Sequence, residues 1–553
     1  MAAVPYISVQ PNYADVFADV SASTVAGEKV WLSYYASNAP SSSVHVKLPL
    51  VQTKDDGKDV DTQGGVKIGE DVEVSGGPAR GLRLRRVQGS WLDLELVQAP
   101  STEREPTETA GESSRSARTL QPEIELDAGV QVRFPRKTLT QFLPTVGTSK
   151  VNDNYTNYPT IDAFDLSLGT ADDERDLFVA GGAEGALYTG LLVGEFDAEH
   201  ARAAAVESLS EAEQHILSGE APDPEEQKWE LEARVRLAVN AARARLGKKT
   251  ALKGHVGDVR FAKFFPSNRV VLSTSSDLTC RIWDPFTGDN PRTLEGHKRA
   301  VLSAGIIGRG RTVLTAGADG SVRLWDVAAP KQIRLMGSER YSAVNCLALD
   351  KANEGSEAEE STFVVGLASG AWQSFDLRTA TATLGGSKYT FPPGEPPSAS
   401  DLWTQSPTAG VSSIDVHGHT IVTATTNGIV SVWDARALSS SITSSAATAA
   451  TEGPAGLVTA WRRNNAEINS LKLVPASSGG RLDVLVATQD GLPYRAALAA
   501  VGSDAVASNS WAGWAPRVLH EYAGWDCDPT SWIGVDAQQR TVIAGAEGAV
   551  RRY

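Results

Sequence analysis

The sequence predicts an all-β fold: a seven-bladed β-propeller with a small N-terminal β domain and a helical insertion after the first blade. Three observations lead to this prediction. A strand-turn-strand segment recurs seven times, its copies are spaced as propeller blades are, and the chain ends one strand short of a complete unit. A propeller repeats a four-stranded sheet around a central axis, so its sequence must show such a period.

The repeated segment is a β-hairpin. Each copy is a short apolar or β-branched run that ends in a tight turn, and glycine supplies the left-handed backbone there in every copy but one. Leu278 takes that place in the second copy. The copies occupy residues 176–185, 269–278, 311–320, 362–370, 419–428, 483–491 and 540–548.

A further strand precedes each hairpin, which gives every unit at least three strands. The turns at Leu278 and Gly320 are separated by a distance within the roughly 40 to 45 residues expected of a blade. The chain stops at Tyr553, on the third strand of the last unit, so that blade needs a strand from elsewhere. RKTLTQF (136–142) is similar to the fourth-strand segments of other units, and we expect it to close a propeller that spans 136–553.

Outside the repeats, three regions have their own character. Residues 1–98 alternate polar and apolar side chains and predict a small β domain, and 99–122, rich in Ser, Thr, Glu and Pro, predict a flexible linker. Residues 197–248 are strong helix formers, with Asp223 and Pro224 at a typical helix start. We favour a helical hairpin packed on the propeller rim over a helix dedicated to partner binding.

Composition limits the classes of partner and compartment. Lys and Arg number 52 against 67 Asp and Glu, a net charge of -15, which argues against nucleic acid or an anionic membrane and favours a basic protein surface. The three cysteines are far apart, and neither a signal peptide nor an 18-residue apolar run is present. We therefore expect a soluble protein of the cytoplasm, the nucleus or both.

Two successive units carry a Gly-His pair upstream of the hairpin and a Trp-Asp pair after it, a pattern that resembles the WD40 repeat. These units also contain the residue types of a Ser-His-Asp hydrolase. The two sets are His255, Ser273, Asp277 and Trp283, and His297, Thr315, Asp319 and Trp325. An active site needs one accessible nucleophile beside an oxyanion hole, so a set that occurs twice favours a structural chain of hydrogen bonds, as expected in a WD40-like blade.

Other possible sites are weaker. GIIGRGRTV (305–313) joins two strands and lacks the lysine of a phosphate-binding loop, so it predicts a turn. His417 and His419 flank a glycine without a third ligand nearby, which favours a polar turn over a metal site. We predict no catalytic residue, metal or cofactor. An enzyme in the central channel is the alternative, and it would need titratable residues that converge on an accessible pocket.

Residues 251–327 and 525–553 contain more specific features. The segments GHVGDVRFAKFFPS and EGHKRAVLSAGIIGRGR, and the terminal DCDPTSW and RRY, resemble the proteasomal ATPase-associated factor family. The resemblance implies a WD40 chaperone that binds the C-terminal domain of one proteasomal AAA ATPase subunit. Such a protein assists assembly of the base of the proteasome regulatory particle, where other assembly chaperones are possible partners. The alternative is a generic WD40 adaptor, such as a substrate receptor of a ubiquitin ligase.

Topology alone suggests where a partner would bind. In WD40-like propellers the loop before each innermost strand opens on the narrow face, and acidic residues lie in four of these loops. They are Asp258, Glu339, Glu467 and Asp526. Each taken singly is compatible with a solvated carboxylate, but together they form a hypothetical ring for a basic partner.

Overall fold

The structure of the protein is a computed structural model, which describes the following parts of the chain and a few single residues between them. They are residues 2–10, 27–36, 39–51, 67–68, 73–75, 82–87, 93–98, 130–133, 137–139, 160–167, 177–192, 249–350, 362–378, 382–386, 409–436, 456–476, 481–498, 516–525 and 527–553.

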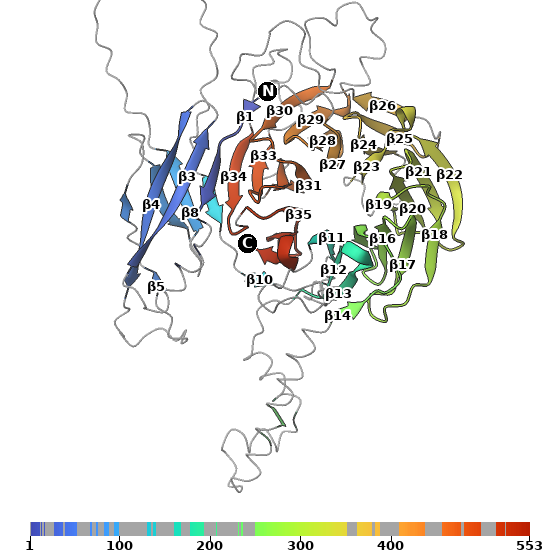
Figure 1. Cartoon of the computed structure of the whole chain (residues 1–553), viewed down its shortest axis with the longest axis horizontal. Helices are drawn as coiled ribbons and strands as arrows, with labels where there is room; N and C mark the ends of the chain where they lie inside the picture. Colours follow the sequence, from blue (N-terminus) through green and yellow to red (C-terminus); the bar gives the residue numbers. More distant parts are fainter. Residues whose placement is uncertain are drawn as a thin grey trace, which may run out of the picture.

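Seven antiparallel sheets follow one another around a ring, which confirms the seven-bladed propeller (Figure 1). Blades 1 to 3 contain β11–β14 (Ile161–Leu166, Leu177–Gly182, Leu187–Leu191, Lys249–Ala251), β15–β18 (Val259–Phe264, Val271–Ser275, Thr279–Trp283, Arg292–Glu295) and β19–β22 (Val301–Ile307, Thr312–Gly317, Ser321–Asp326, Lys331–Gly337). Blades 4 and 5 contain β23–β26 (Val344–Leu349, Thr362–Leu367, Trp372–Asp376, Ala382–Gly386) and β27–β30 (Val411–His417, Thr420–Thr425, Ile429–Asp434, Leu457–Arg462). Blades 6 and 7 contain β31–β34 (Ile468–Pro475, Leu482–Thr488, Tyr494–Ala497, Arg517–Tyr522) and β35–β37 (Thr530–Val535, Thr541–Gly545, Val550–Arg552).

Blade 7 takes its fourth strand from the other end of the chain. β10 (Lys137–Leu139) pairs antiparallel with β37, with Thr138 opposite Arg551. This strand lies in the segment 136–142 that was expected to close the propeller. The first strands of successive blades contact one another, and β11 of blade 1 contacts β35 of blade 7, so the ring is closed.

Two N-terminal strands extend blades instead of forming a separate sheet. β1 pairs parallel with β30 of blade 5, and β9 pairs parallel with β34 of blade 6, where β8 and β7 continue the same sheet. β2 to β6 form another sheet. These strands are β1 (Ala2–Ala3), β2 (Tyr6–Val9), β3 (Gly27–Ala36), β4 (Ala39–Val51), β5 (Lys67–Ile68), β6 (Glu73–Ser75), β7 (Leu82–Val87), β8 (Asp93–Gln98) and β9 (Val130–Arg133). Residues 1–98 are thus linked to the propeller by strand pairing, and a domain boundary at residue 98 stays a prediction.

The expected linker 99–122 lies outside the described residues, and so does most of the helical insertion 197–248. Leu231, Arg234 and Val235 are described there and are helical, and the side chains of Leu231 and Val235 are buried. The helical state of these residues agrees with the helix-forming sequence, whereas the helical hairpin itself stays a prediction. Within the described parts of the chain, no helix is long and apolar enough to cross a membrane.

The core lies between neighbouring blades. Val322 and Met336 of blade 3, for example, pack against Val344 of blade 4. The second strand of each blade is buried on both faces, as in β16, where all five residues are buried. This explains why the repeated runs are continuously apolar or β-branched, since fully burying such a side chain contributes roughly 1.5–3 kcal/mol.

Every innermost strand has a β-bulge at its second residue. A bulge leaves one residue outside the strand ladder and redirects its side chain. The seven bulged residues are Asp162, Arg260, Leu302, Asn345, Ser412, Asn469 and Ser531.

Four of these side chains connect one blade to the next. Each donates a hydrogen bond to the carbonyl of the first residue of the following innermost strand. The bonds are Asn345 Nδ2 to Val411 O (2.9 Å), Ser412 Oγ to Ile468 O (2.6 Å), Asn469 Nδ2 to Thr530 O (2.8 Å) and Ser531 Oγ to Ile161 O. The last bond joins blade 7 to blade 1, so it also helps to close the ring.

Candidate protein-binding face

The four residues singled out in blade 2 form one hydrogen-bonded chain. The indole N–H of Trp283 donates to Ser273 Oγ at 2.8 Å, and Ser273 Oγ lies 2.7 Å from His255 Nε2. The other ring nitrogen, His255 Nδ1, lies 2.8 Å from Asp277 Oδ2. Because the Asp277 carboxylate can only accept, the proton of the neutral histidine ring lies on Nδ1, and Nε2 then accepts from the Ser273 hydroxyl.

Blade 3 repeats this arrangement. Trp325 Nε1 donates to Thr315 Oγ1 at 2.8 Å, which lies 2.8 Å from His297 Nε2, and His297 Nδ1 lies 3.1 Å from Asp319 Oδ2. Blade 5 keeps part of it, since Trp433 Nε1 donates to Thr423 Oγ1 at 3.1 Å.

These chains fix structure and do not expose a nucleophile. Ser273 and Thr315 are 0% exposed, so neither hydroxyl can meet a substrate. The aspartates instead hold the loops that precede the innermost strands: Asp277 accepts the backbone N–H of Val256 (3.2 Å), and Asp319 accepts that of Lys298 (3.0 Å). The chains therefore brace the loops of the narrow face.

The buried histidines predict a loss of stability in mild acid. Burial lowers the pKa of His255 and of His297, more than their aspartate partners raise it. As the pH falls through about 6.5, the histidines of the unfolded chain take up protons while those of the folded chain do not. The free energy of unfolding is therefore highest above that pH and falls below it, by up to about 1.4 kcal/mol per pH unit for each histidine. Urea unfolding from pH 7.5 to 5 should show this fall, and a His255→Asn variant should show a shallower one. Equal slopes for the two proteins would contradict it.

The structure describes three of the four acidic residues proposed as contacts, and Asp526 lies outside the described residues. Asp258 precedes β15, Glu339 begins a short 3-10 helix before β23, and Glu467 precedes β31. They therefore belong to blades 2, 4 and 6 and do not form one cluster. Glu339 is exposed, whereas Asp258 and Glu467 are half-buried. Burial raises the pKa of Glu467, and its role as a contact stays a prediction.

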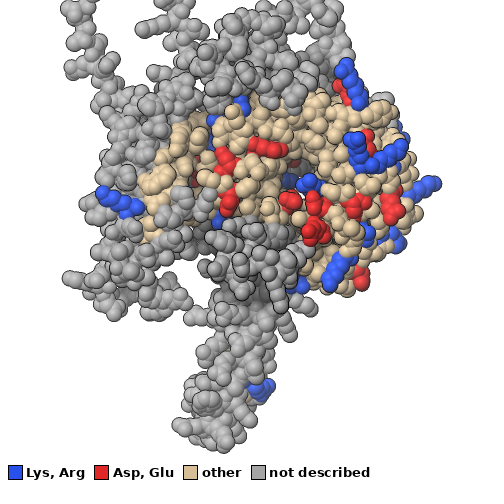
Figure 2. Space-filling model, viewed as in Figure 1, with Lys and Arg blue, Asp and Glu red and all other residues tan. Residues whose placement is uncertain are grey.

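A more concentrated acidic region lies where blades 1 and 2 meet. Asp258 Oδ1 accepts the backbone N–H of Glu184 at 3.2 Å, and Glu184 is itself exposed. Burial raises the pKa of the bulged residue Asp162, which also senses Arg260 and Asp258. Figure 2 shows several acidic side chains, with a few basic ones among them, at the rim of the central opening. Asp162 and Glu184 could not be predicted from the sequence, because no sequence motif marks the bulge at Asp162 or the turn that contains Glu184.

Exposed apolar residues accompany these charges. Val256 is 83%, Tyr341 78% and Leu278 40% exposed, and all three lie in loops or turns of the same face. Leu278 (φ 71°) and Tyr341 (φ 52°) have left-handed backbones, which side chains other than glycine adopt at a cost. Leucine in place of glycine at position 278 was the signal in the sequence that could have marked this region. Exposed apolar groups beside charges are typical of a protein-binding surface.

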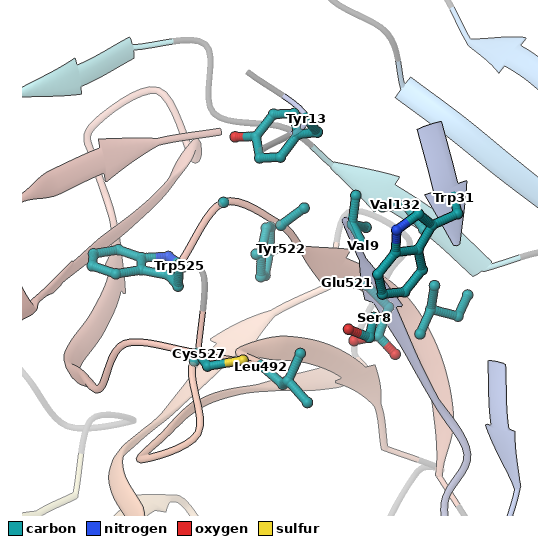
Figure 3. Close-up of a pocket in the computed structure, with 14 residues that line it drawn as sticks. Ser8, Val9, Tyr13, Trp31, Val132, Leu492, Glu521, Tyr522, Trp525 and Cys527 are labelled. Atoms are coloured by element: carbon teal, nitrogen blue, oxygen red, sulfur yellow. The ribbon is translucent and has the colours of Figure 1, made fainter. Parts of the chain in front are cut away.

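A pocket of about 160 Å³ lies where strand β2 meets blades 6 and 7. Its walls include Leu492, Tyr522 and Trp525, and Figure 3 shows these side chains around the pocket together with that of Glu521. The Glu521 carboxylate is paired with Arg463. The pocket is therefore mainly apolar. The charged group in its wall, the Glu521 carboxylate, belongs to the ion pair at the contact between blade 6 and strand β2. Among the described residues, no three His, Cys, Asp or Glu side chains are grouped so as to hold a metal ion.

Comparison with known proteins agrees with this geometry. The family described as WD domain, G-beta repeat, matches residues 247–284 and 288–326, which contain the two complete hydrogen-bonded chains. A segment of 49 residues is 43% identical to the 26S proteasome regulatory subunit RPN14 of Saccharomyces cerevisiae, and it covers 9% of this chain and 12% of the yeast protein. The chain is thus a seven-bladed β-propeller in which residues 247–284 and 288–326 match the WD40 repeat, and such a fold typically serves as a non-catalytic scaffold for protein interactions.

Proposed function

We propose that this protein is a non-catalytic scaffold that binds the C-terminal domain of a proteasomal AAA ATPase subunit and assists assembly or regulation of the base of the regulatory particle. The observation that carries the proposal is the 43% identity to a 26S proteasome regulatory subunit. The resemblance of residues 251–327 and 525–553 to the proteasomal ATPase-associated factors supports the same role. A cytoplasmic or nuclear location belongs to this proposal.

The narrow face is the proposed binding surface. Its exposed apolar side chains supply area that a partner can bury, and Glu184 and Glu339 supply accessible negative charge. A net charge of -15 favours encounter with a basic partner surface. Asp258, Glu467 and Asp526 remain proposed contacts.

The partner's identity can be tested by purifying the tagged full chain from native lysate and identifying the co-purifying proteins by mass spectrometry. Proteasomal ATPases without core-particle subunits would support an assembly role. Cullin-type ligase subunits, with no proteasome subunit, would replace the proposal with the ubiquitin-ligase adaptor. Turnover of any substrate by the purified chain would favour the enzyme alternative.

Charge reversal on the narrow face should slow association. With the purified ATPase partner, Glu184→Lys combined with Glu339→Lys should lower the association rate constant by about tenfold or more at low salt, because electrostatic steering is lost. The difference should shrink as salt screens the charges. Asp289→Lys is a control with half the change in charge, since Asp289 is exposed in the β17–β18 turn, at the opposite end of the strands. Stopped-flow measurements that show the same slowing for both proteins would refute the assignment of this face.

A further inference from the structure

The outer edge of blade 3 differs from the other outer edges that the structure describes. β22 has seven residues, whereas β14, β18 and β26 have three, four and five. It lies on the outside of the ring (Figure 1), and no described strand pairs with its outer side. Ile333 and Leu335 of β22 are 52% and 54% exposed. A long edge strand with exposed apolar residues is a ready template for another strand.

The chain itself shows how such an edge is occupied. In blade 5, β1 adds to the outer strand β30 in parallel, with Ala3 opposite Arg462. In blade 6, β9 adds to β34 in parallel, with Val132 opposite Glu521. An extended segment from a remote part of the sequence is therefore the established occupant of this position in two blades.

The outer strands of blades 3, 5 and 6 share a feature that β26 of blade 4 also has. Each has a register shift that skips one residue in its pairing with the third strand. The skipped residues are Ile333 in β22, Val458 in β30 and Leu519 in β34. Both added strands pair with residues beyond the skipped one. The bulge thus leaves the edge able to pair, and the equivalent part of β22 is residues 334–337.

The side chains of the outer strand of blade 3 are more exposed than those at equivalent positions in blades 5 and 6. The residue two positions after the bulge is Ala460 in blade 5 and Glu521 in blade 6, and these are 6% and 4% exposed. In blade 3 it is Leu335, which is 54% exposed although its side chain is larger and more apolar than that of Ala460. The bulged residues follow the same trend, because Val458 and Leu519 are half-buried and Ile333 is exposed.

We propose that the outer edge of β22 binds an extended segment of a partner protein, parallel to β22, with apolar side chains at alternate positions and an acidic residue at its N-terminal end. Strand addition supplies main-chain hydrogen bonds, and the alternate side chains cover Ile333 and Leu335. Lys331 is exposed at the start of β22 and supplies positive charge for an acidic residue. The proposal rests on the outer edge of β22 and not on the loops of the narrow face, so it does not depend on the ATPase as partner.

A second copy of this chain is a poorer occupant. Two-fold pairing of β22 with itself would be antiparallel, whereas both added strands in this protein are parallel. Pairing centred on the strand would also place Arg334 opposite Arg334, and like charges directly opposite are unfavourable.

The test uses the full chain and a fluorescent peptide of sequence Glu-Val-Thr-Val-Thr-Val-Glu. We expect saturable binding by fluorescence anisotropy and slower hydrogen exchange at the amides of residues 334–337 when the peptide is bound. Leu335→Glu, which removes apolar surface and repels the peptide, should weaken binding at least about tenfold. Phe286→Glu is the matched control, because Phe286 is 60% exposed in a turn of blade 2, and it should bind as the unchanged protein does.

Three outcomes would overturn the proposal. The first is no binding at millimolar peptide, and the second is unchanged affinity in Leu335→Glu. The third is a concentration-dependent dimer that Leu335→Glu abolishes, which would make a second copy the occupant. Glu184→Lys alone, in the turn between β12 and β13 of blade 1, should leave peptide binding intact, so failure here and failure of the proposed function remain distinguishable.

Discussion

Replacing Arg463 with alanine is expected to lower the free energy of unfolding by about 3–5 kcal/mol, because it leaves a buried carboxylate without its partner. The side chains of Arg463 and Glu521 are each 5% exposed and form an ion pair, with one bond of 3.0 Å from Arg463 Nη1 to Glu521 Oε2. The guanidinium also lies 3.9 Å from the ring centroid of Tyr494. Urea unfolding of the variant and the unchanged protein measures the loss.

The same arginine holds the N-terminal strand. Arg463 Nη2 donates to the carbonyl of Pro5 at 3.3 Å, so the substitution should also speed hydrogen exchange in β2. Burial raises the pKa of Glu521 in spite of the arginine, which shows how costly the charge is there. A double variant, Arg463→Met with Glu521→Leu, should recover much of the stability, since no charge then stays buried. A double variant no more stable than Arg463→Ala would contradict this explanation.

Replacing Trp283 with alanine is the second substitution with a large expected effect, about 3–5 kcal/mol of unfolding free energy. The indole is 0% exposed and packs in the core between blades 1 and 2. Its loss leaves a cavity and removes the donor to Ser273 Oγ. Urea unfolding followed by far-UV circular dichroism provides the measurement, because it does not depend on the tryptophan signal.

A matched variant separates packing from hydrogen bonding. Trp283→Phe keeps most of the apolar volume and loses the N–H, so it should cost less than Trp283→Ala, with about 1 kcal/mol due to the lost bond. Phe286→Ala, at a residue 60% exposed, should change stability by less than about 0.5 kcal/mol. An equally small effect for Trp283→Ala would show that the hydrogen-bonded chain of blade 2 contributes little.

The repeats could be predicted because their physical requirements are local. Turns such as Asp319-Gly320 need a residue tolerant of left-handed backbone, and second strands buried on both faces read as unbroken apolar runs. The strand at 137–139 was also predictable, because the last blade lacked a fourth strand. β1 was not, since a two-residue strand carries no period and its pairing with β30 depends on a blade more than 450 residues away.

The site was predicted less completely than the fold. The histidine, hydroxyl and tryptophan residues recur at fixed spacing, so their chains were visible in the sequence. The burial of Glu467 and the proximity of Asp162 to Asp258 depend on how neighbouring blades approach each other, which no single repeat encodes. Tyr341 could not be predicted as a surface residue of the site either, because its exposure is a property of the assembled ring.

The central claim is that the narrow face binds the partner, and hydrogen exchange of the full chain with a purified proteasomal ATPase subunit tests it most directly. The claim predicts slower exchange in the loops at 252–258, 276–278 and 338–343, with little change in the β17–β18 turn at the other end of the strands. Protection confined to that other end, or no protection at saturating ATPase, would contradict it.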